Sequence, residues 1–132
     1  MTALHFAAYK GNFKALEMLC NYGADYSKIT NNGQNVLHLA AQGGMVESFI
    51  YFQSLIDINC IDEKQSTPLH WACYMNNESI VTFLLAQQNI NVNSKDEQDQ
   101  TPLHLATTYG HTKLVKKLLR GGAEPKIKNK NG

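Results

Sequence analysis

Four of the five histidines recur at nearly equal intervals, and regularly spaced histidines can hold a metal ion. They are His5, His38, His70 and His104. Zinc ligands must all lie within about 2.0–2.3 Å of one ion, whereas packed helix layers lie about 8–10 Å apart. Histidines in neighbouring layers therefore cannot share a metal. We predict no metal site, and expect each ring to hydrogen-bond to its helix cap and to the backbone of an adjacent link.

The sequence also lacks a grouping typical of nucleophilic catalysis. Cys73 follows His70 by three residues, but both fall on a helix face that we predict to be buried, and no third group is evident. No glycine-rich phosphate loop is present either. We therefore expect no enzyme activity and no cofactor.

The histidines close a four-residue signature that recurs along the chain. Its copies are Thr2-Ala3-Leu4-His5, Asn35-Val36-Leu37-His38, Thr67-Pro68-Leu69-His70 and Thr101-Pro102-Leu103-His104. They are 33, 32 and 34 residues apart, and a fixed period of this length indicates stacked supersecondary units. We predict one domain over 1–132, with repeats at 2–34, 35–66, 67–100 and 101–132.

Each repeat carries the signals of two short helices. Thr67 and Thr101 are typical N-caps, and the prolines that follow suit the first helical position. The first helix then ends at a residue suited to the left-handed conformation. These residues are Gly11, Gly44, Asn76 and Gly110. Apolar residues at helical spacing, such as Leu16 and Leu19, predict the second helix.

This organisation resembles the ankyrin repeat over essentially the whole chain. The Thr-Pro-Leu-His tetrapeptides, the glycine-alanine turns at 23–24 and 122–123, and Asn59 and Asn93 all match the family pattern. The resemblance implies an all-α repeat solenoid, in which stacked helix-turn-helix units are joined by β-hairpin fingers. It also implies protein–protein recognition through a concave face.

Several positions depart from the family pattern. The second repeat begins with Asn35-Val36, although asparagine also caps well. Segments 54–57 and 88–90 replace the glycine-alanine turn, and Gln53 stands where a buried leucine is expected. Gln65 and Asp99 replace the usual finger glycine. We expect the fold to survive with less favourable turns at these places.

Both ends of the chain look cut. The sequence starts at the first cap, and residues 128–132 resemble the finger of a fifth repeat. Stacked repeats need polar terminal faces, yet the first repeat would expose Phe6 and Phe13. We therefore expect the chain to be part of a longer protein.

Composition and cysteine usage indicate a soluble chain inside the cell. Hydrophobic residues make up 43% and charged residues 17% of the sequence. No apolar run reaches the roughly 18–20 residues of a membrane helix, and no secretory signal opens the chain. Three unpatterned cysteines do not indicate a disulfide framework. We expect a cytoplasmic location.

Charge is strongly segregated behind a net value of +1. The second and third repeats each carry −3, and the fourth carries +6. Acidic residues gather at two finger tips, where they would attract a basic partner segment. They are Asp62, Glu63, Asp96, Glu97 and Asp99. The basic last repeat lacks interleaved aromatic residues, so nucleic acid is not the favoured partner.

The resemblance implies that the finger tips and the two residues after the small helical pair face the partner. We predict a partner-binding set at these positions and in a nearby turn. It comprises Tyr9, Lys10, Tyr22, Glu63, Lys64, Tyr74, Met75, Glu97, Gln98 and Tyr109. Tyrosine is enriched among interface hot spots, and methionine adds an adaptable apolar contact. The expected partner is another protein or an extended peptide.

Two further surface features remain open. Trp71 stands where other repeats have phenylalanine or leucine, which favours core packing. Ile50 and Tyr51 stand on the convex side where charges are usual, so they could form a second contact surface.

A second functional reading places the repeats inside a larger enzyme. Residues 57–62 and 67–74 resemble ankyrin segments of DHHC-type protein palmitoyltransferases, where they would recruit substrate or regulate the enzyme. The catalytic Asp-His-His-Cys tetrad of that family is absent from this chain.

Overall fold

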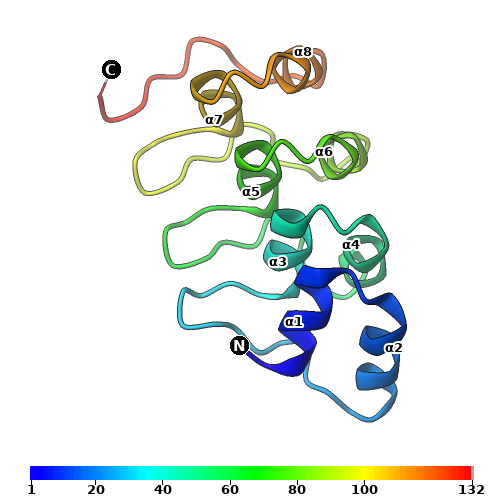
Figure 1. The fold of residues 1–132 in the computed structure, drawn as a ribbon. Coiled ribbons are helices and arrows are strands. Elements are labelled where there is room, and N and C mark those ends of the chain that lie inside the picture. The colour runs from blue at the N-terminus through cyan, green and yellow to red at the C-terminus, as the bar shows by residue number, and fades with distance from the viewer. Residues whose placement is uncertain (132) are drawn as a thin grey trace.

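The computed structural model describes residues 1–131, and this range contains eight helices that stack as four antiparallel pairs (Figure 1). The first helices of the pairs form an inner row and the second helices an outer row. The inner helices are α1 (Ala3–Lys10), α3 (Val36–Gly43), α5 (Pro68–Tyr74) and α7 (Pro102–Thr108). The outer helices are α2 (Phe13–Asn21), α4 (Val46–Gln53), α6 (Glu78–Leu85) and α8 (Thr112–Arg120). This arrangement confirms the predicted helical repeat solenoid.

Every inner helix begins at a capping box built by the signature. In the third repeat the Thr67 hydroxyl accepts the His70 N–H at 3.3 Å, and the Nδ1 atom of His70 accepts the Thr67 N–H at 3.1 Å. Thr2, Asn35 and Thr101 make the same reciprocal pair with their own histidines. The predicted caps are therefore confirmed, and each stabilises its helix by about 1 kcal/mol.

The other ring nitrogen of the signature histidine joins the helix to a link. Nε2 lies 2.9 Å from the Lys28 carbonyl oxygen for His5 and 2.9 Å from that of Ser66 for His38. For His70 the partner is the Gln100 carbonyl, at 2.8 Å. These contacts confirm the structural role expected for His5, His38 and His70, whereas within residues 1–131 the His104 ring bonds only to its cap residue Thr101. Burial lowers the pKa of His38 and of His70.

The turn after α3 depends on glycine for two reasons. Gly44 has a φ of 71°, in the left-handed region. A Cβ atom there would lie only 2.9 Å from the Asn77 side-chain oxygen. The Asn77 amide donates to the Ala41 and Gln42 carbonyls at 2.6 and 3.1 Å, and so caps α3 from the next repeat. Asn76 takes the corresponding left-handed conformation in the third repeat, with a φ of 60°, as predicted.

The core runs along the solenoid between the two rows of helices. Phe49 and Phe52 of α4 are its largest fully buried side chains. Phe6 is 55% exposed, as expected. Phe13, however, is half-buried, because its ring packs edge-on against Tyr51 with centroids 5.7 Å apart. The prediction that Phe13 is exposed is therefore wrong. Of the two convex residues singled out in α4, Tyr51 is half-buried against Phe13 and Ile50 stays exposed.

The fingers are hydrogen-bonded turns. No strand is present within residues 1–131, so the predicted β-hairpins are not confirmed. In the second finger the Asp62 N–H donates to the Ser66 carbonyl at 3.0 Å. The equivalent bond runs from the Thr30 N–H to the Gln34 carbonyl at 2.8 Å in the first finger, and from the Asp96 N–H to the Gln100 carbonyl at 3.0 Å in the third. One such bond closes a turn but does not build a ladder.

Single backbone bonds also connect neighbouring fingers. The Glu63 N–H donates to the Asn32 carbonyl, and the Glu97 N–H donates to the Lys64 carbonyl, both at 3.0 Å. In the same way, the Lys130 N–H donates to the Gln98 carbonyl of the third finger at 3.1 Å. The fingers are therefore held in register from repeat to repeat.

The departures from the family pattern are absorbed by local turns. In the second repeat the Leu55 and Ile56 N–H groups both donate to the Phe52 carbonyl. The Asn59 side chain then bridges to the third repeat, donating to the Asn89 carbonyl at 2.7 Å and accepting the Asn91 N–H at 2.9 Å. Gln53 is half-buried in the place of a leucine.

Gln65 and Asp99 adopt left-handed conformations, with φ values of 61° and 57°, where the first finger has Gly33 at 76°. A residue with a Cβ atom pays about 1–2 kcal/mol for this conformation. We predict that Gln65→Gly raises the free energy of unfolding by about 0.5–1 kcal/mol, because the relief of strain exceeds the extra backbone entropy of glycine. Urea unfolding measures the change. Gln98→Gly is the matched control, since Gln98 is exposed without a positive φ and glycine should lower stability there.

The buried signature histidines predict a pH dependence of stability. The pKa values of His38 and His70 are lower in the fold than the ordinary value of 6.5, chiefly through burial, although the carboxylates of Asp62 and Asp96 oppose this for His70. As pH falls, these histidines take up protons at a higher pH in the unfolded chain than in the folded chain. Their contribution to stability is therefore fully present above about pH 6.5 and is lost as pH drops towards the folded pKa. Urea midpoints between about pH 7.5 and pH 5.5 should fall less steeply for His70→Gln than for the wild type. Equal slopes would contradict this assignment.

Candidate partner-binding site

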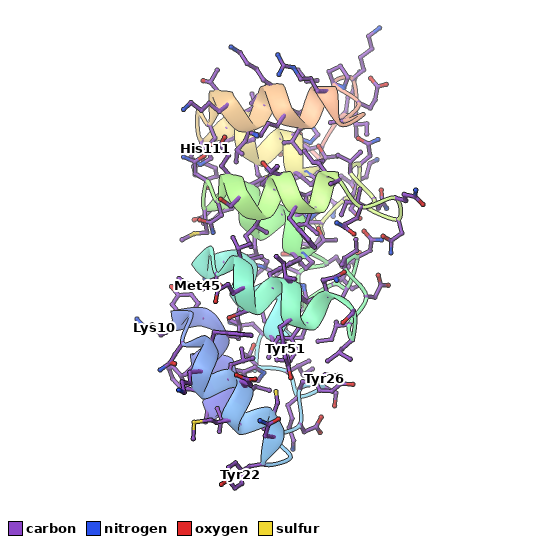
Figure 2. All side chains as sticks on the ribbon, turned by 90° about the vertical axis from the view of Figure 1, so that its right-hand side faces the viewer. Lys10, Tyr22, Tyr26, Met45, Tyr51 and His111 are labelled. Carbon is purple, nitrogen blue, oxygen red and sulfur yellow. The ribbon has the colours of Figure 1, made fainter. Side chains whose placement is uncertain are left out.

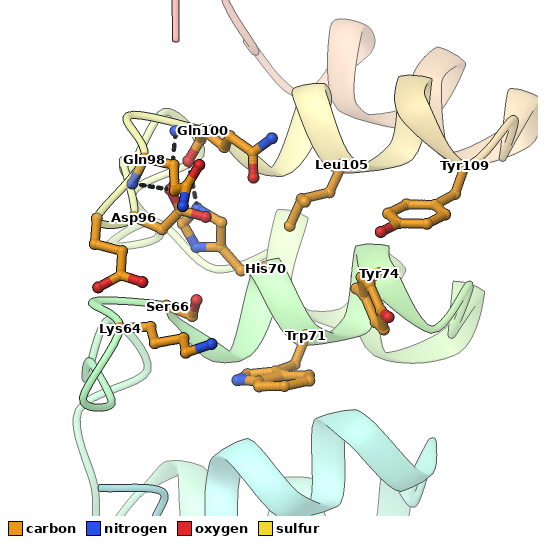
Figure 3. A pocket seen from close by; sticks show the side chains of 11 residues that line it. Lys64, Ser66, His70, Trp71, Tyr74, Asp96, Gln98, Gln100, Leu105 and Tyr109 are labelled. Atoms are coloured by element: carbon orange, nitrogen blue, oxygen red, sulfur yellow. Dashed lines mark hydrogen bonds between the residues drawn. The ribbon is translucent and has the colours of Figure 1, made fainter. Parts of the chain in front are cut away.

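A pocket of about 330 Å³ lies where α5 and α7 meet the second and third fingers (Figure 3). Aromatic residues come from α5 and from Tyr109 at the end of α7, and both fingers contribute polar residues. The lining residues are Lys64, Ser66, His70, Trp71, Tyr74, Asp96, Glu97, Gln98, Gln100, Leu105 and Tyr109.

Aromatic rings follow one another along the helical side of the pocket. The ring centroids of Trp71 and Tyr74 are 5.9 Å apart and those of Tyr74 and Tyr109 are 4.9 Å apart, and both pairs are nearly perpendicular. His111 extends the row by stacking on Tyr109 at 6.3 Å. The stacking of repeats causes this arrangement, because it brings the ends of α5 and α7 side by side. The nearby Tyr74 hydroxyl raises the pKa of Tyr109.

Trp71 is fixed by a hydrogen bond to a finger. Its indole N–H donates to Oδ2 of Asp62 at 2.9 Å. The other oxygen of Asp62 accepts the Lys64 and Ser66 N–H groups, both at 2.9 Å. Asp62 is therefore buried and structural, and the prediction that it attracts cations at an exposed tip is wrong. Trp71 packs against the core as expected, but it also lines the pocket, which the sequence did not indicate.

The third finger presents its acidic residues differently. Oδ1 of Asp96 accepts the Gln98 and Gln100 N–H groups at 2.9 and 3.0 Å, as Asp62 does in the preceding finger. Asp96 is nevertheless half-buried, and Glu97 beside it is exposed. Both residues line the pocket. Its acidic character therefore comes from the third finger.

Half of the predicted binding set meets in this pocket. Lys64, Tyr74, Glu97, Gln98 and Tyr109 all line it. Two more of the predicted residues are exposed beside it without lining it. Met75 follows Tyr74 and is 41% exposed, and Glu63 lies at the tip of the second finger.

The first-repeat members of the predicted set lie elsewhere. Tyr9 is half-buried at the end of α1, with the Lys10 ammonium 5.6 Å from its ring centroid. Tyr22 is 89% exposed but follows α2, so it lies at the opposite end of the helix pair from Lys10 (Figure 2). The expectation that Tyr22 sits near Tyr9 is wrong, because the second helix returns antiparallel to the first.

Among residues 1–131, no ion pair neutralises the pocket carboxylates. Within residues 1–131 the one salt bridge joins Lys117 of α8 to Glu78 of α6 at 3.5 Å, on the outer row. Lys64 is exposed and brings a positive charge to the pocket rim. The pocket therefore combines two carboxylates with one lysine.

Other chemically capable residues do not form a centre. Within the described part of the chain, no three histidine, cysteine or acidic residues are grouped closely enough to hold a metal. The three cysteines are free thiols. Burial raises the pKa of Cys60 to about 11 and that of Cys73 to about 12, so both stay protonated near neutral pH. None of the helices over residues 1–131 is long and apolar enough to cross a membrane.

Comparison with known proteins also identifies ankyrin repeats over nearly the whole sequence. A family model described as ankyrin repeats (three copies) matches residues 1–52 and 37–129. Palmitoyltransferase AKR1 of Lachancea kluyveri is 33% identical over 81 residues, which cover 58% of this chain and 11% of that protein. Inversin of Canis lupus familiaris is 30% identical over 79 residues, covering 58% of this chain and 7% of inversin.

A third relative is alpha-latrotoxin-Lhe1a of Latrodectus hesperus, which is 40% identical over 74 residues, or 54% of this chain and 5% of the toxin. The chain thus spans about a tenth or less of the length of these three relatives. Their shared element is the repeat, which is also what the signature, the helix pairs and the family model describe. The chain belongs to the ankyrin repeat family.

Proposed function

We propose that this chain is a protein–protein interaction module that binds a partner through its concave face, at the pocket between α5, α7 and the two fingers. Ankyrin repeats generally mediate such interactions. The observation that carries the proposal is the run of exposed aromatic residues beside unneutralised carboxylates. Tyr74 is 42% and Tyr109 51% exposed, although both pack against other rings.

The charge of the pocket region favours a basic partner segment. The second and third repeats each carry −3, and Glu63, Glu97 and Asp99 lie at or beside the finger tips. Opposite charges steer a partner and fix its orientation more than they add affinity. An extended peptide or a loop could reach between the fingers and the inner helices.

We further propose that the chain acts by binding rather than by catalysis. Its buried thiols and hydrogen-bonded histidines are engaged in packing and capping, which supports this reading. A role as the substrate-recruiting or regulatory part of a larger enzyme, as the likeness to palmitoyltransferase AKR1 would suggest, rests on 11% of that protein and is not favoured. Free cysteines agree with an intracellular location.

Affinity capture from cell lysate tests the concave face. The double variant Tyr74→Ala/Tyr109→Ala removes the two exposed rings and should lose a partner that the wild type retains. Loss of the ring–ring contact costs about 1 kcal/mol of stability, so circular dichroism must show that the variant is folded. The control is Tyr22→Ala, which removes a tyrosine that is 89% exposed and lies outside the pocket, and which should retain the partner.

Retention of every partner by the double variant would contradict the assignment of recognition to the concave face. The convex Ile50 surface and the basic residues of α8 would then be the next surfaces to test.

A further inference from the structure

The pocket at Trp71 has the features of a site for one cationic side chain. It joins the aromatic surface of α5 to two carboxylates of the third finger within about 330 Å³. Aromatic faces attract cations through their quadrupole, and most strongly when the aromatic residue is tryptophan. A carboxylate beside such a face supplies the hydrogen bonds that a cationic side chain must keep when it leaves water.

The indole is held in place before any partner arrives. The bond from its N–H to Asp62 fixes one edge, and Asp62 is itself fixed by two backbone N–H groups. The Tyr74 ring stands nearly perpendicular to it at 5.9 Å. The ring of Trp71 therefore offers a fixed plane against which a flat group can stack, at little cost in side-chain entropy.

The acidic side of the pocket has unused acceptors. Both hydrogen bonds that Asp96 accepts from residues 1–131 go to Oδ1, which leaves Oδ2 available. The Glu97 side chain is exposed, and no salt bridge within the described residues occupies it. A planar donor with several N–H groups matches two neighbouring carboxylates better than a point charge does.

We propose that this pocket binds an arginine side chain of the partner, with the guanidinium stacked on Trp71 and donating to Asp96 and Glu97. This inference rests on the proposed function and adds the chemistry of the anchor residue. Arginine fits better than lysine because its guanidinium is flat, weakly hydrated and able to stack and donate at once. Lys64 lines the same pocket and weakens the binding of any cation by like-charge repulsion.

The chain carries its own reporter of this site, since Trp71 is its single tryptophan. Titration with the peptide acetyl-Gly-Ser-Arg-Ser-Gly-amide should produce a saturable change in tryptophan fluorescence. The same peptide with citrulline, which keeps the shape but not the charge, should bind about tenfold more weakly. The lysine peptide should fall between them. Equal binding of the arginine and citrulline peptides, tighter binding of the lysine peptide, or no response to any of them would overturn the proposal.

Variants at the pocket rim separate the contributions. Glu97→Gln changes an exposed residue and should weaken arginine-peptide binding severalfold. Asp96→Asn should also weaken it, and this variant keeps the side-chain oxygen that accepts the Gln98 and Gln100 N–H groups. Lys64→Gln should tighten binding severalfold, an effect that a damaged fold would not produce. Glu47→Gln, a change of the same kind on α4, is the control and should leave the titration unchanged. Unchanged affinity in both Glu97→Gln and Lys64→Gln would contradict the assigned site.

The peptide titration tests the arginine anchor and the capture experiment tests the proposed function, so either claim can be contradicted without the other. If the arginine peptide gives no signal while capture still depends on Tyr74 and Tyr109, the concave face binds its partner and the arginine anchor is wrong. If the peptide binds as expected while capture is indifferent to the two tyrosines, the anchor stands and the assignment of the main recognition surface falls.

Discussion

In the first three repeats, the two hydrogen bonds of the signature histidine ring tie the start of a helix to the spacing of the stack. At His70, Nδ1 accepts the N–H of the capping threonine, and Nε2 reaches the carbonyl of Gln100 at the end of the next link. A buried imidazole can serve both partners only as the neutral tautomer that carries its proton on Nε2. One residue type therefore sets where the inner helix begins and how the following link lies against it. The positions of the fingers and of the inner helices relative to one another follow from these two bonds.

The pocket is a product of this arrangement. The bonds between fingers hold Lys64 against Glu97 along the rim, and the stacked inner helices bring Tyr74 beside Tyr109. Neither pair is close in sequence, and neither would meet if the links had free register. The scaffold thus converts a periodic sequence into a continuous surface whose exposed residues can vary without changing the fold. The described chain uses this freedom to place aromatic rings next to unneutralised acidic groups.

The sequence predicted those parts of the structure that depend on local chemistry. Helix caps at Thr67 and Thr101, the left-handed Asn76 and the hydrogen-bonded histidines all follow from backbone rules that act over a few residues. Contacts between side chains of different repeats could not be foreseen in the same way. The packing of Phe13 against Tyr51 depends on how one repeat is placed against the next. The burial of Asp62 depends on how the second finger folds back onto the first turn of α5, where Trp71 lies nine residues further on. Tyr22 was misplaced for a related reason: the antiparallel return of α2 carries its end away from Tyr9.

The fit of Gly44 against Asn77 has a consequence for how the sequence can change over time. The Asn77 amide caps the end of α3 from the neighbouring repeat and fills the space that any Cβ atom on residue 44 would need. A substitution at one position therefore changes which residues the other can accept. The two residues belong to different repeats, so an exchange of the second or the third repeat on its own would keep this contact only where the incoming repeat supplies the matching residue.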